Sequence, residues 1–170
     1  MTTYDLFGGA VTVAAPAGLI DASNFRQVPD TQEVLLSPDS DISLIVEILQ
    51  QVGEGATQAA LDAAVRYHFD SLAHDNDAKQ SHIDWVEAQD GGDGESTHPA
   101  LLGGTQRVCK FGKEALEDTV YVWVAVVRVP SKGIDVVLSV NSPNAPRDGD
   151  AIFRTAAKSL RIIDYGLFAA

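Results

Sequence analysis

The residues with the clearest chemical potential lie between positions 18 and 33. This stretch carries three carboxylates, Asp21, Asp30 and Glu33, and one cation, Arg26. Grouped carboxylates create a negative surface that attracts cationic groups of a partner. The structural alternative is that Asp21 caps a helical turn, Asp30 forms a turn and Glu33 is a solvated strand residue.

The local sequence predicts how these side chains are held. Asp21, followed by Ala-Ser-Asn, is typical of an N-cap whose side chain accepts a hydrogen bond from a free backbone N–H. Pro29 pushes Val28 toward extended geometry, so the helical turn ends there. Asp30 and Thr31 then form a turn, and residues 33–36 begin a strand. We therefore expect a rigid acidic patch beside a sheet edge.

A fourth carboxylate lies in the next strand. Residues 42–49 alternate between two faces that are both mostly apolar, which predicts a central strand covered on both sides. Glu47 is the exception in this strand. It either reaches water near the end of the sheet, pairs with Arg26 or another cation, or belongs to a contact surface.

The N-terminal half also predicts a hairpin and a helix. Short strands at 4–7 and 10–14 meet at Gly8-Gly9, a pattern typical of a tight hairpin or bulge. Residues 56–74 predict a helix with an apolar stripe. His68 lies on that stripe, so we expect a packed, hydrogen-bonded core histidine. Acidic residues and His74 at the helix end lack the spacing of known metal motifs, and we predict no metal.

Residues 80–118 are harder to interpret. Residues 80–89 predict an edge strand, and the run 90–99 predicts a mobile acidic loop without a core-forming residue. The segment 101–111 is weakened by Gly103-Gly104, with a possible strand at 105–109. Cys109 has no histidine nearby in sequence, which favours a structural role over a nucleophilic one. Residues 113–118 predict a charged turn.

The C-terminal part predicts a hairpin and a second helix. Residues 119–129 and 134–140 are strongly β-forming and are joined by a short turn after Pro130. Asp148 or Asp150 is expected to cap a helix. Its apolar face would be Ile152, Phe153, Ala156, Leu160 and Ile163, and its solvated face Arg154, Lys158 and Arg161. Leu167 and Phe168 are expected to dock on the sheet.

These elements predict an α+β fold with a largely antiparallel sheet of about six strands and helices on both faces. A chain of 170 residues suits a single domain spanning 1–170. The single Cys109 fits a reducing compartment, and the N-terminus lacks the features of a signal peptide. We therefore expect a soluble intracellular domain.

The charge of the chain restricts its partners. Twelve Lys and Arg against twenty-four Asp and Glu give a formal net charge of −12. A field of this sign disfavours nucleic acid and anionic membranes, and it favours a partner with a basic face.

Four motifs resemble one known family. They are LFGGA (6–10), P-x-G-x-IDAS (16–23), FR-x-VPDTQEV (25–34) and SLIVEIL (43–49). Together they are similar to the N-terminal signature of the Ran guanine nucleotide release factor family. The resemblance implies a twisted antiparallel sheet sandwiched by helices, the PsbP-like or Mog-type sandwich.

The same resemblance implies a function. A member of this family binds the small GTPase Ran, promotes release of its guanine nucleotide and affects nucleocytoplasmic transport, so we expect location in nucleus and cytoplasm. It needs no cofactor or catalytic residue, and we expect a monomer. The implied Ran-binding residues are Asp21, Arg26, Asp30, Glu33, Glu47 and Gln50. Gln50 stands where some relatives carry a second acid.

Two other function classes stay open. The chain could be a generic protein-interaction adaptor with the same fold. It could also be an enzyme, although the sequence contains no paired catalytic dyad, nucleophile elbow, P-loop or zinc motif. Binding of purified Ran, with and without excess GTP, discriminates among these classes.

Overall fold

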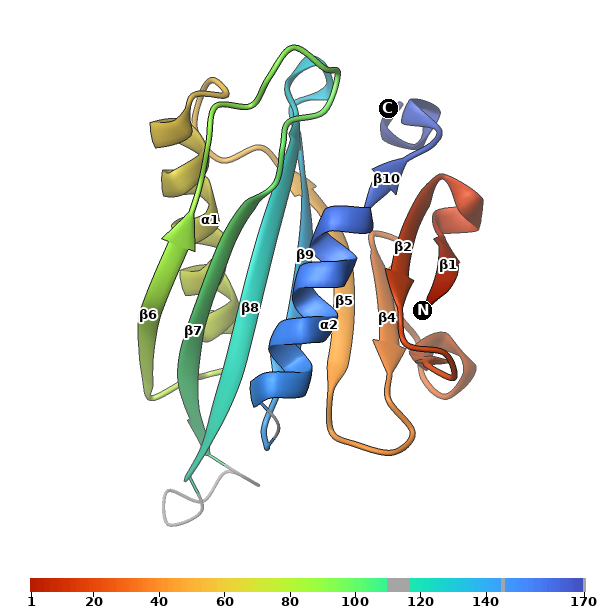
Figure 1. Ribbon diagram of the computed structural model, residues 1–170, viewed down its shortest axis with the longest axis vertical. Coiled ribbons are helices and arrows are strands. Elements are labelled where there is room, and N and C mark those ends of the chain that lie inside the picture. Colours follow the sequence, from red (N-terminus) through yellow and green to blue (C-terminus); the bar gives the residue numbers. More distant parts are fainter. Residues whose placement is uncertain (110–116, 145, 170) are drawn as a thin grey trace.

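The strands within the described part of the chain form two antiparallel sheets. The computed structural model describes residues 1–109, 117–144 and 146–169. The larger, seven-stranded sheet has the order β3 (Ile20–Asp21), β4 (Gln32–Leu36), β5 (Ser43–Gln50), β9 (Ile134–Ser142), β8 (Glu117–Val129), β7 (Ala100–Cys109) and β6 (Gln80–Glu87). The smaller, three-stranded sheet has the order β1 (Thr2–Leu6), β2 (Val11–Ala15) and β10 (Arg161–Ile162) (Figure 1).

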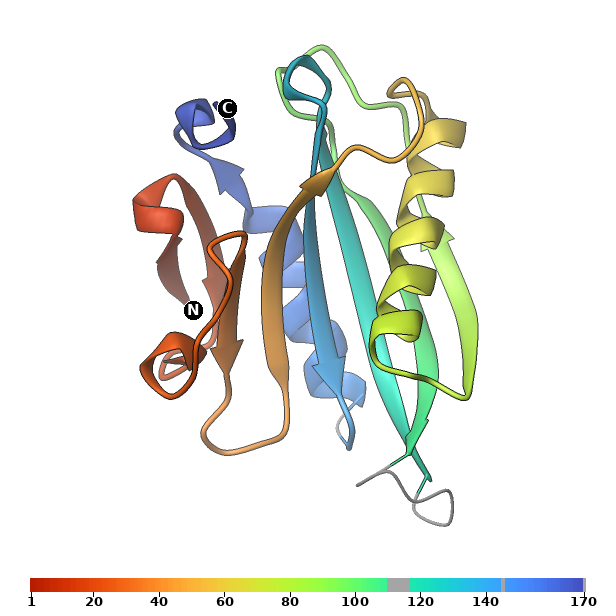
Figure 2. The same ribbon diagram turned by 180° about the vertical axis from the view of Figure 1, so that it is seen from behind.

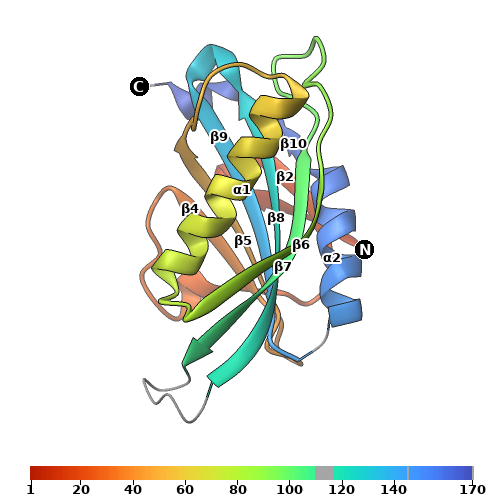
Figure 3. The same cartoon turned by 90° about the vertical axis from the view of Figure 1, so that its left-hand side faces the viewer.

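Two helices lie on opposite faces of the larger sheet. Helix α1 (Gln58–Asp75) packs on β6, β7 and β8, and helix α2 (Pro146–Ser159) packs on β8 and β9 from the other side. Figures 2 and 3 show the sheet between the two helices. The smaller sheet lies beside α2 and contacts it through β2. The predicted α+β sandwich with a helix on each face is confirmed.

Alternating side chains of the central strands form one core on each face. In β8, Val122, Val124 and Val126 point to α1, where Leu61 and Phe69 meet them. The intervening residues of β8 point to the α2 side and join a second core with Phe153 and the smaller sheet. Both sides of β8 are buried, which agrees with its continuous apolar sequence.

The predicted sheet of about six strands has seven, and the separate three-stranded sheet was not predicted, because short strands escape a periodicity argument. Strands β3 and β10 have two residues each, too few to show alternation. Strands β1 and β2 form the expected antiparallel hairpin across Gly8-Gly9, but they pair with β10 in a separate sheet. Both glycines have positive φ, 69° and 93°, which suits a tight connection.

The last helix is shifted from its predicted position. It begins at Pro146, so Asp148 lies in the first turn and neither Asp148 nor Asp150 is the N-cap. Proline is well suited to the first helical turn because its missing N–H is not needed there. The helix ends at Ser159, since Arg161 and Ile162 pair with β2 instead. Ile163, predicted on the apolar face, is 62% exposed.

The segment 90–99 is a loop, but it does contain buried residues. Gly91 and Thr97 are buried. The Gly91 N–H donates to the carbonyl of Ala56 at 2.8 Å, and the Thr97 N–H donates to the carbonyl of Arg128 at 2.8 Å. The loop is therefore bonded to the body of the protein at two points, contrary to the prediction that it lacks core-forming residues.

The two glycines of β7 have a packing role that the sequence did not reveal. Strand β7 is continuous over ten residues. A Cβ at Gly103 would collide with the indole of Trp85, and one at Gly104 would collide with the backbone carbonyl of His82. Glycine therefore permits close packing here and does not weaken the strand. Most of the charged turn predicted at 113–118 lies outside the described residues, as does the side chain of Cys109.

Candidate functional site

Asp21 is held at the start of the acidic segment by a short helical turn. It ends β3, and its Oδ1 accepts a hydrogen bond from the Ser23 N–H at 2.9 Å, so the predicted N-cap is confirmed. The following Ala22 is fully buried and anchors the turn. The N–H groups of Phe25 and Arg26 both donate to its carbonyl, which closes the turn before Pro29.

Asp30 is positioned by the turn that leads into β4. The Gln32 N–H donates to the carbonyl of Pro29 at 3.0 Å, and the Ile48 N–H donates to the carbonyl of Thr31 at 2.9 Å. These bonds tie the turn to β5, while the Asp30 side chain is exposed. The predicted turn is confirmed, and it presents a carboxylate to solvent from a well-supported backbone.

Glu33 is partly buried under the connection between β1 and β2. Its Oε1 accepts a hydrogen bond from the Phe7 N–H at 3.1 Å. Burial raises the pKa of the Glu33 carboxyl above its ordinary value, the Phe7 hydrogen bond opposes that rise, and the nearby charge of Asp21 adds to it. Glu33 and Asp21 are therefore close enough for their charges to interact.

These three carboxylates border one cavity, which we call the acidic cavity. Its volume is about 370 Å³, and its remaining wall comes from the helical turn, the Pro29 segment, Phe7 and Leu167. Leu167 belongs to the C-terminal 3₁₀ turn η6 (Tyr165–Phe168). Three chain segments distant in sequence thus build the surface that carries Asp21, Asp30 and Glu33.

Glu47 lies on the opposite face of the sheet from Glu33. In the β4–β5 ladder Glu47 is directly opposite Gln32, and Glu33 is opposite Val46. Directly paired residues share a face and neighbouring residues alternate, so Glu33 and Glu47 point to different sides. The Gln32 Nε2 donates to Glu47 Oε2. Because Gln32 also lines the acidic cavity, it connects Glu47 to that cavity.

Arg26 and Gln50 do not line the acidic cavity. Arg26 is exposed on the loop after the helical turn, and within the described residues its guanidinium forms no ion pair with Glu47. Gln50 is exposed at the end of β5, opposite Ile134 of β9. The structure thus brings together three of the six predicted residues, links Glu47 to them through Gln32, and leaves Arg26 and Gln50 outside the lining of the cavity.

A buried charged cluster that the sequence analysis missed supports the scaffold. Arg128 and Asp135 are both fully buried, and His68 is 3% exposed. Arg128 Nε donates to Asp135 Oδ1 at 2.8 Å, and His68 Nε2 lies 2.9 Å from Asp135 Oδ2. Arg128 also donates to the carbonyls of Val52 and Gly55. The cluster joins α1, the β8–β9 hairpin and the loop after β5.

The charge of Asp135 is stabilised in spite of its burial. Burial opposes ionisation, but hydrogen bonds from His68, Arg128 and the Val52 N–H, together with the Arg128 charge, hold the pKa of Asp135 below its ordinary value. His68 is thus the packed, hydrogen-bonded histidine that the sequence predicted. The sequence also contained a signal for Arg128 and Asp135. Arg128 continues the valine alternation of β8, and it faces Asp135 across the predicted hairpin.

Comparison with known proteins agrees with this architecture. A family model described as Ran-interacting Mog1 protein matches residues 4–143. The chain belongs to the Mog1 family. This agrees with the resemblance noted in the N-terminal motifs.

Full-length relatives of this Mog1-family chain share about a third of its residues. The Ran guanine nucleotide release factor of Danio rerio is 32% identical, over 96% of this chain and 97% of the relative. The nuclear import protein mog1 of Schizosaccharomyces pombe is 33% identical, over 96% and 98%.

Solved structures also resemble this Mog1-family chain. The crystal structure of the Saccharomyces cerevisiae Ran-binding protein Mog1p has a TM-score of 0.77, 26% identity and coverage of 99% of this chain and 98% of that chain. Cyanobacterial PsbP (CyanoP) from Synechocystis has a TM-score of 0.58 at 20% identity, over 95% and 91%, and shows the shared fold.

Among the described residues, no group of three or more His, Cys, Asp or Glu side chains is placed to hold a metal ion. In the same part of the chain, neither helix combines the length and the apolar character needed to span a bilayer.

Proposed function

We propose that this protein binds the small GTPase Ran and promotes release of its bound guanine nucleotide, and that it thereby acts in nucleocytoplasmic transport. The observation that carries the proposal is membership of the Mog1 family, whose model is described as Ran-interacting. Relatives named Ran guanine nucleotide release factor and nuclear import protein support the same role.

The binding surface we propose is centred on the acidic cavity. Asp21, Asp30 and Glu33 border it, and the chain has a formal net charge of −12. Such a surface attracts a basic face of a partner. Glu47 contributes from the other side of β4 through Gln32, while Arg26 and Gln50 make contacts at the rim.

The mechanism we propose requires no catalytic residue. A nucleotide bound to a GTPase is held partly by cations that contact its phosphates. Carboxylates that engage those cations favour the nucleotide-free state, so nucleotide affinity falls. Linkage then requires that added nucleotide weakens the complex by the same factor. We further propose that the protein acts as a monomer without a cofactor, as a regulator of Ran rather than an enzyme, and that it is present in nucleus and cytoplasm.

Charge reversal tests this surface. The Asp30→Lys/Glu33→Lys variant is expected to weaken Ran binding at least about a hundredfold, since two attractive contacts become repulsive. It should also abolish stimulated nucleotide release. Titration calorimetry and the release of a fluorescent guanine nucleotide from Ran measure the two effects. Glu33→Gln keeps an acceptor for the Phe7 N–H and should weaken binding less.

The matched control changes the same amount of charge elsewhere. Asp70→Lys/Asp75→Lys alters two exposed carboxylates of α1, away from the acidic cavity. At physiological salt, its affinity for Ran should stay within a few-fold of the affinity of the unaltered chain. Equal loss of binding in both variants, or full binding by the first variant with an unchanged melting curve, would show that the acidic cavity is not the Ran site.

A further inference from the structure

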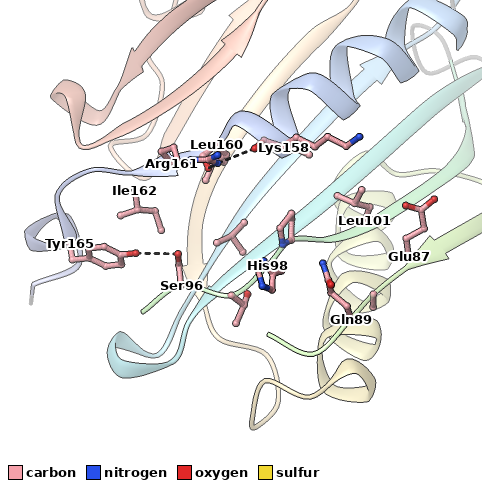
Figure 4. Close-up of a pocket in the computed structure, with 15 residues that line it drawn as sticks. Glu87, Gln89, Ser96, His98, Leu101, Lys158, Leu160, Arg161, Ile162 and Tyr165 are labelled. Carbon is pink, nitrogen blue, oxygen red and sulfur yellow. Dashed lines mark hydrogen bonds between the residues drawn. The ribbon is translucent and has the colours of Figure 1, made fainter. Parts of the chain in front are cut away.

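A second cavity, larger than the acidic cavity, lies on the other side of the turn η6. Its volume is about 710 Å³, within the range of small-molecule sites. One wall is formed by the end of α2 with β10 and Tyr165, and the other by residues 87–89 and 96–99. Figure 4 shows it extending from Tyr165 and Ser96 at one end to Glu87 at the other, with His98 between them.

The floor of this cavity is apolar. Leu101, Val127 and Leu160 line it, and each is 7% exposed. They come from β7, β8 and the residue after α2, so the main sheet and the C-terminal segment both contribute. An apolar floor of this kind favours the aliphatic or aromatic part of a ligand, because its burial removes apolar surface from water.

The charges around the cavity have a positive excess. Lys158 and Arg161 line it, and neither forms an ion pair with a carboxylate among the described residues. Arg161 donates from one guanidinium nitrogen to the carbonyls of Lys158 and Leu160, both at 2.9 Å, which retains its charge. Glu87 contributes the carboxylate of the lining, and its Oε1 lies 3.7 Å from Nη1 of Arg154.

This excess is unusual in a chain with a formal net charge of −12. The sequence suggested that Lys158 and Arg161 belong to a solvated helix face. Both side chains are exposed, as expected, and both also lie at the rim of a cavity with Leu101, Val127 and Leu160 at its floor. Two cations beside such a floor are complementary to an amphipathic anion.

The cavity wall is held in place before any ligand binds. The Tyr165 hydroxyl donates to Ser96 Oγ at 3.1 Å and closes one end. Thr97 Oγ1 accepts from the Arg128 N–H at 2.8 Å, and the Thr97 N–H donates to the Arg128 carbonyl. The wall is thus bonded to the buried Arg128 cluster. A preformed wall lowers the ordering cost of binding.

We propose that this cavity binds a small amphipathic organic anion. Its acidic group is held by Lys158 and Arg161, and its apolar part lies on Leu101, Val127 and Leu160. None of its lining residues borders the acidic cavity, although the turn η6 contributes Tyr165 to one cavity and Leu167 to the other.

Binding of anilinonaphthalene sulfonate, a fluorescent amphipathic anion, tests the proposal on the full chain. Decanoate should displace this probe, whereas inorganic phosphate, which has no apolar part, should not. Uncharged phenylnaphthylamine should bind about tenfold more weakly than the sulfonate. The Lys158→Gln/Arg161→Gln variant should lose about tenfold in affinity for the sulfonate.

The control variant is Lys132→Gln/Arg147→Gln, which removes two exposed cations that do not line the cavity. It should bind the sulfonate as the unaltered chain does. Backbone amide shifts caused by the probe should cluster at residues 96–101 and 158–165. Equal affinities of the two variants, with matching melting curves, would overturn the proposal. Shifts clustered elsewhere would do the same.

Discussion

At the scale of single residues, the Arg128–Asp135 pair is the feature with the largest expected effect. Both side chains are fully buried, and each polar end has several partners. A buried ion pair gains little over a well-packed apolar pair, but loss of one partner leaves an uncompensated charge in the interior. The pair therefore makes the hairpin, α1 and the loop after β5 depend on one carboxylate.

Asp135→Asn should destabilise the protein by about 3–5 kcal/mol, because it leaves Arg128 buried without its counter-charge. Urea denaturation measures this difference. Asp62→Asn is the matched control, since Asp62 forms an exposed ion pair with Arg66 at 2.7 Å and should cost about 0.5 kcal/mol or less. Similar losses in the two variants would contradict the assigned role of the buried cluster.

The same pair determines part of the pH dependence of stability. The pKa of Asp135 is lower in the folded protein than in the unfolded chain. As the pH falls, the unfolded chain therefore becomes protonated at Asp135 before the folded protein does. The contribution of Asp135 to the free energy of unfolding is complete above the pKa that this group has in the unfolded chain. It is lost as the pH falls through the folded pKa. The difference between Asp135→Asn and the unaltered chain in urea should accordingly shrink under acidic conditions.

At the scale of elements, strand β7 shows why close packing needs glycine. The β6–β7 ladder places Gly104 opposite Ile83 and next to the backbone carbonyl of His82. The ring of Phe69 from α1 approaches the same glycine from the helix side. An added Cβ would have to displace both main chain and helix, and main chain yields less easily than the end of a flexible side chain.

Gly104→Ala should therefore destabilise the protein by about 1–3 kcal/mol or more through overpacking, despite alanine's lower conformational freedom in the unfolded chain. Thermal melting and urea denaturation measure the loss. Ser81→Ala in the adjacent strand is the control, because Ser81 is exposed and the change should stay within about 0.5 kcal/mol. An unchanged melting temperature for Gly104→Ala would mean that α1 and β6 separate easily.

At the scale of the whole molecule, the negative charge affects how the protein meets its partner. A formal net charge of −12 produces a long-range field that raises the encounter rate with a basic surface. Salt screens this field, with a Debye length of about 8 Å at physiological ionic strength. Long-range attraction acts mainly on association, whereas short contacts at the acidic cavity act mainly on dissociation.

The association rate constant with Ran should fall about tenfold or more between about 10 mM and about 150 mM salt, with a smaller change in the dissociation rate. Stopped-flow mixing over a salt series measures both rates. The Asp30→Lys/Glu33→Lys variant should show a weaker salt dependence of any remaining association. Salt-independent association of the unaltered chain would exclude electrostatic steering.

Local signals in the sequence determined the main elements of this protein. The Asp21 cap, the turn at Asp30, the β8–β9 hairpin and α1 each depend on residues within a few positions of one another. Alternation and caps act over one turn or one strand, so they can be recognised without the fold. The acidic character of residues 18–33 was recognised for the same reason.

Only the tertiary structure decided which of these side chains meet. Glu33 and Glu47 separate because strand register assigns them to opposite faces, and register depends on pairing between segments. His68 meets Asp135 because α1 packs across the sheet. The cavity beside Lys158 forms because β10 leaves the helix to pair with β2. Each of these contacts depends on burial and pairing between residues far apart in the chain, which local patterns do not encode.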